Sequence, residues 1–230
     1  MVRPLSLLPN LITLSNLFLG CMGVVWAFEL DLERAVYMIW ICAVLDVLDG
    51  LAARAVGVAS ELGKQLDSLA DLVSFGLLPS AILYTLWLSF IPTPWAILSF
   101  LITVFSALRL AKFNLDPDQG TNFKGLPTPA TALLISSFPM ITDQNIDIIR
   151  LGLENQVFWF LIVGLLCYLM VSNVPLIGFK FKNFSWNDNK HRYFILGCAV
   201  TLIAFLGTLG IPWILFIYIG ISLVWQNGQN

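Results

Sequence analysis

Long apolar runs separated by short polar segments dominate this chain, and they predict a bundle of membrane-spanning helices. A helix needs about 20 apolar residues to cross a bilayer. Six runs are close to that length, at residues 11–28, 35–56, 64–88, 92–113, 127–142 and 157–178. We therefore expect six transmembrane helices in this part of the chain.

The C-terminal part continues the apolar pattern but interrupts it once. No charged residue lies between Tyr193 and Trp225, and this stretch is too long for one crossing. Gly207, Gly210 and Pro212 fall near its middle, and glycine and proline favour turns. We expect a hairpin of two short helices, which gives an all-α membrane protein with about eight transmembrane helices. One long, broken helix is the alternative.

The composition supports a location in the membrane. Hydrophobic residues make up 58% of the 230 residues and charged residues only 11%, whereas soluble domains carry about 25% charged residues. The formal net charge of −2 excludes the basic type of nucleic-acid-binding protein. The four cysteines form no CxxC pair, so we interpret them as small apolar residues rather than metal ligands or disulfides.

The distribution of positive charge predicts the orientation. With the N-terminus in the cytoplasm, ten of the twelve Lys and Arg residues fall on the cytoplasmic side, and only Arg34 and Arg150 fall outside. Cytoplasmic loops of membrane proteins carry this excess of positive charge. We therefore expect a multi-pass protein with both termini in the cytoplasm. His191, the only histidine, falls in a segment rich in Lys and Arg that we interpret as a solvated loop.

Four aspartates interrupt the apolar pattern at one predicted hairpin. Asp46 and Asp49 are three residues apart on the second span, and Asp67 and Asp71 are four apart on the third, so each pair shares a helix face. An ionised carboxylate in hydrocarbon is costly without a counter-charge. Oxygen ligands favour Mg²⁺ or Mn²⁺, and two facing pairs of carboxylates can hold two such cations for phosphoryl chemistry.

The spacing of these aspartates resembles the CDP-alcohol phosphotransferase signature, D-x2-D-G-x2-A-R-x8-G-x3-D-x3-D. All eight positions match in one register: Asp46, Asp49, Gly50, Ala53, Arg54, Gly63, Asp67 and Asp71. The resemblance implies a six-helix core over residues 1–180. The cytoplasmic loop and helical hairpin expected from the apolar pattern then occupy residues 181–230. The resemblance also implies a homodimer that binds a CDP-linked donor at the cytoplasmic face, transfers the phospho-alcohol group to a hydroxyl and releases CMP.

The resemblance also implies a role for each residue of the signature. Asp46, Asp49 and Asp67 would bind metal, and Asp71 would be both a metal ligand and the general base. The CDP donor would be bound by Asp46, Gly50, Ala53, Arg54, Gly63 and Asp67. Small residues also mark close contacts between helices, so a packing role for Gly50 and Ala53 stays open.

The residues around Asp71 indicate the acceptor. The stretch DSLADLVSFGLLP, from Asp67 to Pro79, is similar to phosphatidylserine synthases of the membrane-embedded type. This resemblance implies CDP-diacylglycerol as the donor and L-serine as the acceptor, in a bacterial or archaeal cytoplasmic membrane. The first alternative is the same chemistry with inositol or glycerol 3-phosphate. The second is an ion-coupled transporter that uses its intramembrane aspartates as an ion relay.

Polar residues on two other spans are candidates for substrate contacts. Arg109 and Lys112 lie one helical turn apart near the cytoplasmic end of the fourth span. Either would bind the serine carboxylate, and Arg109 is favoured because it lies deeper and its guanidinium can form two parallel hydrogen bonds. Anchoring at the membrane surface is the alternative for both. Asn10, Thr13 and Asn16 share a face of the first span and would contact the donor or neighbouring helices.

Overall fold

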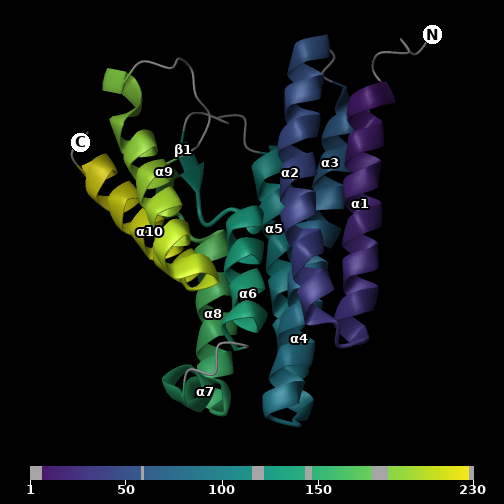
Figure 1. Ribbon diagram of the computed structural model, residues 1–230. Coiled ribbons are helices and arrows are strands. Elements are labelled where there is room, and N and C mark those ends of the chain that lie inside the picture. The colour runs from purple at the N-terminus through teal and green to yellow at the C-terminus, as the bar shows by residue number, and fades with distance from the viewer. Residues whose placement is uncertain (1–6, 58–59, 116–121, 143–146, 178–185, 228–230) are drawn as a thin grey trace.

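The computed structural model describes residues 7–57, 60–115, 122–142, 147–177 and 186–227, and most of its helices run side by side in one bundle (Figure 1). The N-terminal half consists of α1 (Leu7–Phe28), α2 (Leu32–Val56), α3 (Glu61–Leu72), the π-helical turn η2 (Val73–Leu77), α4 (Leu78–Phe90), the 3-10 helix η3 (Pro94–Phe100) and α5 (Leu101–Leu115). The C-terminal half consists of β1 (Asn122–Lys124), α6 (Thr128–Thr142), α7 (Asp147–Leu153), α8 (Gln156–Val171), β2 (Pro175–Ile177), α9 (Trp186–Leu206), η4 (Gly207–Leu209) and α10 (Gly210–Asn227). Residues 181–185 of the predicted cytoplasmic loop, and the basic residues Arg3, Lys180 and Lys182, lie outside the described residues.

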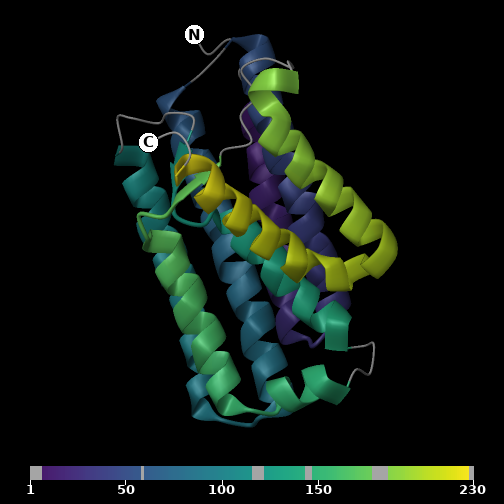
Figure 2. The ribbon, with the colours of Figure 1, turned by 90° about the vertical axis from the view of Figure 1, so that its left-hand side faces the viewer.

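The helices match the predicted membrane spans. Five helical segments are long and apolar enough to cross a membrane, and α6 and α8 are shorter apolar helices. The last of the five, Asn189–Val224, is a hairpin, because α9 and α10 fold back on each other around Gly207, whose φ of 56° lies in the left-handed region (Figure 2). The predicted all-α membrane fold, with a six-helix core and a C-terminal hairpin, is confirmed. The single broken helix is excluded.

Three local features differ from the prediction. The sixth span ends at Val171 instead of near residue 178, because proline cannot continue a helix and Pro175–Ile177 forms a strand that pairs antiparallel with β1. The helix α7 occupies part of the loop expected between the fifth and sixth spans. The helix α9 begins at Trp186, so His191 is a half-buried helical residue and the interpretation as a solvated loop residue was wrong. The charges in this first stretch of α9 hid the apolar periodicity that marks a helix.

The continuous helix α3–η2–α4 is the most buried part of the bundle. Of the most apolar 18 residues in Glu61–Phe90, 67% are buried, compared with 28% for the spans in α1, α2 and η3–α5. Trp87 of α4 stacks on Trp159 of α8 with ring centroids 5.5 Å apart, and both side chains are fully buried. This helix carries two of the four signature aspartates, so the packing around it fixes where they lie.

The π-helical turn η2 interrupts this helix directly after the signature ends at Asp71. Close packing holds the turn from two sides. A Cβ atom on Gly20 of α1 would lie 2.6 Å from Ser74 Oγ, and a Cβ atom on Gly76 would lie 3.1 Å from Ser106 Cβ of α5. A π-turn inserts an extra residue into the helical repeat and often occurs at functional sites. Because of this extra residue, the side chains of α4 point in directions different from those they would have in an uninterrupted α-helix continuing from α3.

Candidate active site

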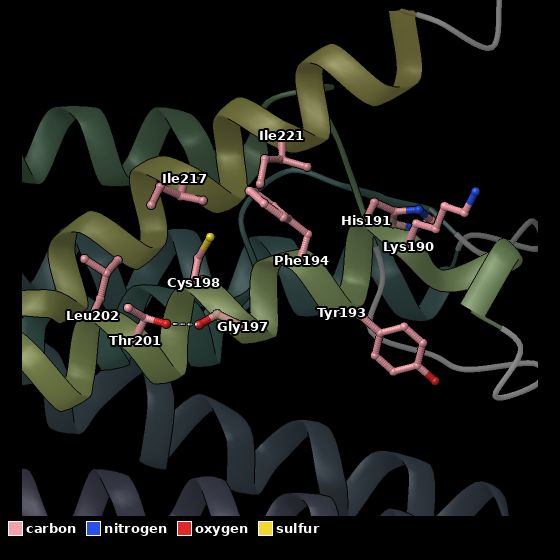
Figure 3. A pocket seen from close by; sticks show the side chains of 10 residues that line it. All are labelled: Lys190, His191, Tyr193, Phe194, Gly197, Cys198, Thr201, Leu202, Ile217 and Ile221. Atoms are coloured by element: carbon pink, nitrogen blue, oxygen red, sulfur yellow. Dashed lines mark hydrogen bonds between the residues drawn. The ribbon is translucent and has the colours of Figure 1, made fainter.

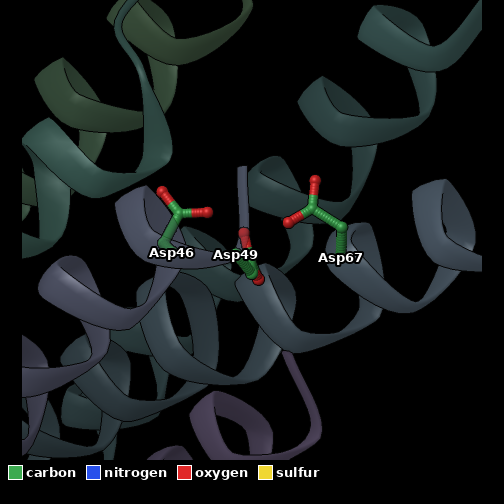
Figure 4. A group of neighbouring side chains, drawn as sticks. All are labelled: Asp46, Asp49 and Asp67. Carbon is green, nitrogen blue, oxygen red and sulfur yellow. The ribbon is translucent and has the colours of Figure 1, made fainter. Parts of the chain in front are cut away.

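Three of the four predicted aspartates come together between the C-terminal half of α2 and the middle of α3 (Figure 4). Asp46 and Asp49 lie on α2 and Asp67 lies on α3, and one carboxylate oxygen from each is within 4.8 Å of the others. Asp49 is buried, and the other two are half-buried. Oxygens on opposite sides of a bound Mg²⁺ or Ca²⁺ ion lie about 4–5 Å apart, so one cation can reach all three carboxylates. The donor set and its spacing therefore fit a divalent metal site.

The helix α1 holds one of these carboxylates in place. Thr13 Oγ1 donates a hydrogen bond to Asp49 Oδ2 at 2.8 Å, and the same hydroxyl lies 3.0 Å from the carbonyl oxygen of Pro9. Both Thr13 and Asp49 are buried. Hydrogen bonds of this kind orient a metal ligand. The sequence left open whether the polar face of α1 contacts the donor or neighbouring helices, and at Thr13 it contacts α2.

The fourth aspartate, Asp71, lies one turn beyond Asp67 on α3, beside the group of three. Its Oδ1 atom is buried and has no hydrogen-bond partner among the described residues. Buried polar atoms are nearly always hydrogen-bonded in folded proteins. The unpaired carboxylate oxygen thus fits a position where a metal or a reacting hydroxyl binds.

The two candidate acceptor cations have different environments. Arg109 of α5 is buried, and its guanidinium interacts electrostatically with the carboxylate of Asp71. Its Nε atom is also buried without a hydrogen-bond partner in the described part of the chain. Lys112, one turn further along α5, is exposed. Of these two residues, Arg109 is therefore the one that combines positive charge with a place beside the aspartates.

The two glycines of the signature also differ in their surroundings. A Cβ atom on Gly50 would meet a single side-chain atom, Arg54 Nη2, at 3.9 Å, so the space beside it is open. A Cβ atom on Gly63 would lie 3.0 Å from Ser60 Oγ and 3.2 Å from Asn10 Oδ1. Ser60 caps α3 by accepting a hydrogen bond from the Gly63 N–H at 3.0 Å. Gly50 therefore borders open space and not a helix contact, whereas Gly63 allows close packing at the start of α3.

The last turn of α2 carries the remaining signature residues. Ala53 is half-buried and Arg54 is exposed. The helix stops soon afterwards because Gly57 adopts a φ of 65° and its N–H bonds to the carbonyl groups of Ala53 and Arg54. An exposed cation one turn from the aspartates is available to an anionic ligand.

The residues that resemble the phosphatidylserine synthase pattern pack inside the bundle. Ser74, Phe75 and Gly76 are all buried. Ser74 donates a hydrogen bond to Asn16 Oδ1 at 2.8 Å, which ties the π-helical turn to α1. These residues form the π-helical turn that directly follows Asp71, so their packing helps to fix the position of the helix that carries it.

The comparison with known sequences agrees with this geometry. The sequence profile of the CDP-alcohol phosphatidyltransferase family matches residues 6–170. This chain belongs to that family. The matched part runs from α1 through nearly all of α8 and contains every residue of the signature. The hairpin of α9 and α10 lies outside it.

Several curated members of the CDP-alcohol phosphatidyltransferase family are similar to this chain. A CDP-diacylglycerol–serine O-phosphatidyltransferase of Helicobacter pylori (strain J99) is 35% identical over 189 residues, covering 81% of this chain and 77% of the relative. The protein of the same name from Bacillus subtilis (strain 168) is 31% identical, covering 76% of this chain and 93% of the relative. An archaetidylserine synthase of Methanothermobacter thermautotrophicus is 34% identical over 133 residues, covering 57% of each chain.

The helix α10 of the hairpin is hydrogen-bonded to β2 of the core. The sequence did not indicate this contact. The Tyr218 hydroxyl donates a hydrogen bond to the Ile177 carbonyl at 3.0 Å, and the Ile177 N–H donates one to Ser222 Oγ at 3.2 Å. Tyr218 is buried and lies near Arg109. Tyr218 and Ser222 are four residues apart, so one face of α10 makes both bonds. Their spacing was visible in the sequence, but their partner on β2 was not.

An apolar cavity of about 710 Å³ lies between α2, α6 and the hairpin. Trp40, Leu134, Ile203 and Tyr218 are among the residues that line it. Trp40 precedes Asp46 on α2 by less than two helical turns. The cavity therefore borders the same helix that carries two of the aspartates.

Proposed function

We propose that this protein transfers the phosphatidyl group of CDP-diacylglycerol to the hydroxyl of L-serine, which gives phosphatidylserine and CMP. The observation that carries the proposal is the cluster of Asp46, Asp49 and Asp67 at the signature positions. The relatives named CDP-diacylglycerol–serine O-phosphatidyltransferase support serine as the acceptor. In the reaction, the serine oxygen forms a bond to the phosphatidyl phosphorus and the bond from that phosphorus to the CMP oxygen breaks. The hydroxyl proton passes to a base on the protein.

We assign Asp46, Asp49, Asp67 and Asp71 as the ligands of two divalent cations, Mg²⁺ or Mn²⁺. The close approach of three carboxylate oxygens and the unpaired, buried Oδ1 of Asp71 support this assignment. When bound, such cations neutralise a diphosphate and stabilise the leaving phosphate oxygen.

Asp71 is the general base of the proposed reaction. A carboxylate can accept a hydroxyl proton when it lies within hydrogen-bond reach of it. One oxygen of the Asp71 carboxylate can bind metal while the other receives that proton, and the Oδ1 atom is buried and unpaired among the described residues. The buried guanidinium of Arg109 interacts electrostatically with the same carboxylate, and its positive charge suits an acceptor that carries a carboxylate group.

The CDP donor binds along the end of α2 and the start of α3. The open space beside Gly50 would take the cytidine, and Ala53 is also small. The exposed Arg54 would contact the diphosphate. Asp46 and Asp67 contribute to donor binding through the metal site. Gly63 contributes because, without a side chain, it allows α3 to start close to α1. The apolar cavity behind Trp40 would take acyl-chain carbons.

Arg109 binds the carboxylate of serine. Its burial beside Asp71 supports this role, and the exposure of Lys112 supports a place for that residue at the membrane surface. Inositol and glycerol lack a carboxylate, so they would leave the guanidinium without a partner. Glycerol 3-phosphate is an anion that could pair with the Arg109 guanidinium through its phosphate. It is therefore the alternative acceptor that tests the assignment most strictly.

The protein works as a multi-pass membrane enzyme with its active site and both termini facing the cytoplasm. The ten-to-two distribution of Lys and Arg supports this orientation. Residues 1–180 form the catalytic core, and residues 181–230 add a loop and the hairpin. A homodimer is the expected assembly.

One assay tests the proposal directly. Purified protein would be given CDP-diacylglycerol and Mg²⁺ or Mn²⁺, with L-serine, inositol or glycerol 3-phosphate in parallel, and CMP release would be measured. We expect release with serine only, and none after EDTA until metal is restored. Release with another acceptor would reassign the substrate within the same chemistry. Absence of both CMP binding and transfer in the presence of divalent metal would instead favour an ion-coupled transporter.

A further inference from the structure

The hairpin carries a second cavity that the proposed reaction does not use. It is a groove of about 880 Å³ between α9 and α10 (Figure 3). None of its lining residues lines the cavity behind Trp40. It therefore needs an occupant of its own.

The groove lies on the most exposed of the predicted membrane spans. Only 11% of the most apolar 18 residues in Asn189–Val224 are buried, and the exposed side chains include Phe194 at 61% and Val200 at 69%. In a membrane these surfaces face lipid. A hollow in such a surface is filled by lipid chains or by another protein.

Charge is confined to one end of the groove. Figure 3 shows Lys190 and His191 at one end, whereas Cys198 and Leu202 lie towards the other. Lys190 is exposed, and Arg192 follows it as a buried cation bonded to Asn189. The helix α9 begins at the end of the bundle where α2 ends and α3 begins (Figures 1 and 2). The basic end of the groove thus lies at the same membrane face as the start of the signature hairpin.

We infer that this groove binds one anionic phospholipid, with the phosphate beside Lys190 and His191 and an acyl chain along Phe194, Cys198 and Leu202. The positions of charge and apolar surface match those of a lipid that stands in the bilayer with its headgroup at the surface. Basic pockets between transmembrane helices bind anionic headgroups in this way. A zwitterionic lipid would gain the same apolar contacts but would lack the net charge that Lys190 attracts. The site is separate from the proposed transfer reaction.

The experiment is a lipid titration of the full-length protein. Delipidated protein in detergent would be titrated with dioleoyl phosphatidylglycerol, with dioleoyl phosphatidylcholine, and with phosphatidylglycerol in the presence of inorganic phosphate, and native mass spectrometry would count the bound lipids. We expect one phosphatidylglycerol to bind at least fivefold more tightly than phosphatidylcholine, with no displacement by inorganic phosphate. Equal affinity for the two lipids would overturn the inference, and so would full displacement by phosphate.

Two substitutions in the groove test separately what the charge of Lys190 and the shape of the groove contribute to lipid binding. Lys190→Gln should weaken phosphatidylglycerol binding about fivefold and leave phosphatidylcholine binding unchanged, since one Lys near an anionic headgroup contributes that much. Gly197→Leu should block the groove, because Gly197 lines it and a Cβ there meets no atom within 4 Å. The matched control is Gly220→Leu on α10, where a Cβ also meets no atom within 4 Å but which does not line the groove. Loss of binding in both leucine variants, or in neither, would contradict the site.

A cysteine inside the groove gives a local measurement that does not depend on a substitution. Cys198 lines the groove, whereas Cys21 is an exposed cysteine on α1. Phosphatidylglycerol should slow the modification of Cys198 by N-ethylmaleimide several-fold more than phosphatidylcholine does, and should leave Cys21 unaffected. If Cys198 were instead protected in proportion to protein concentration and not to added lipid, a second copy of the chain would fill the groove and the inference would be wrong.

Discussion

The helix α3–η2–α4 and the hairpin α9–α10 are both long and apolar, but they differ in what covers them. Their spans have mean hydropathies of 1.6 and 2.3, so the hairpin is the more apolar of the two. Yet 67% of the most apolar part of the central helix is buried, against 11% in the hairpin. In the central helix, Ser74 and Ser80 are fully buried and hydrogen-bonded. In the hairpin, Gly197 and Gly220 border open space.

The difference shows where a membrane protein can keep polar chemistry. Hydroxyls and carboxylates are costly in hydrocarbon unless other protein groups or bound ions satisfy them. The central helix is packed against α1, α2 and α5, and these neighbours provide such partners. The hairpin instead offers apolar surface to lipid and contacts the core at α6 and β2. We therefore expect substitutions in the central region to change activity and substitutions in the hairpin to change lipid binding or stability.

The largest effect should come from Asp71→Asn in the central helix. The amide keeps the shape of the side chain but cannot accept the hydroxyl proton, so the rate constant kcat should fall by about 10²–10⁴-fold. Binding of CDP-diacylglycerol should be largely retained. The control is Asp31→Asn at the opposite end of α2, where the amide oxygen can still accept the Arg34 N–H bond of the helix cap. Activity of Asp71→Asn within threefold of the parent would assign proton removal to another group.

The next effect should come from Arg109→Lys, measured as the KM for serine. A lysine keeps the charge but loses the planar pair of donors, which weakens a charge-assisted contact to the carboxylate. We expect the KM for serine to rise about 10–100-fold and the KM for CDP-diacylglycerol to change little. The control is Lys112→Arg on the exposed side of α5, which should leave both constants within twofold. A selective loss of donor affinity in Arg109→Lys would move Arg109 to the diphosphate site.

A smaller effect should come from Thr13→Val, which tests the support that α1 gives to Asp49. Valine has the shape of threonine but cannot donate the 2.8 Å hydrogen bond to Asp49 Oδ2. The Mn²⁺ concentration needed for half-maximal activity should rise about tenfold, as expected when a metal ligand loses an orienting partner. Ser15→Ala is the matched control, since Ser15 is exposed on the same helix and bonds only locally to the Leu11 carbonyl. Equal metal requirements in the two variants would show that Asp49 needs no support from α1.

The smallest effect should come from Tyr218→Phe in the hairpin. The substitution removes the hydrogen bond to the Ile177 carbonyl, which contributes about 1 kcal/mol to the free energy of unfolding. The melting temperature should fall by about 2–4 °C, with activity retained within about threefold. Tyr168→Phe, at a 65% exposed position on α8, should leave the melting temperature unchanged. A loss of activity comparable to that of Asp71→Asn would break the distinction between the two regions and place Tyr218 in the catalytic site.

Much of the fold could be read from apolar run lengths, because a membrane span must bury its own backbone groups in a helix and therefore needs about 20 apolar residues. The hairpin was predicted because the uncharged run is too long for one crossing and Gly207 and Pro212 near its middle favour a turn. The start of α9 was missed because charged residues interrupt its apolar pattern. The pairing of β1 with β2 was missed because three-residue strands carry no periodic signal and are stabilised by a partner more than 50 residues away.

For the candidate active site, the sequence by itself identified the signature residues and determined that Asp46 and Asp49, like Asp67 and Asp71, share a helix face. Helical spacing is a local property, so it needs no knowledge of neighbours. Only the tertiary structure decided that three of the carboxylates approach within 4.8 Å and that Arg109 is buried while Lys112 is exposed. It also decided that Gly50 borders open space while Gly63 is a packing position. Each of these depends on how far one helix is rotated and shifted against another, and close packing of side chains from distant parts of the chain sets that arrangement.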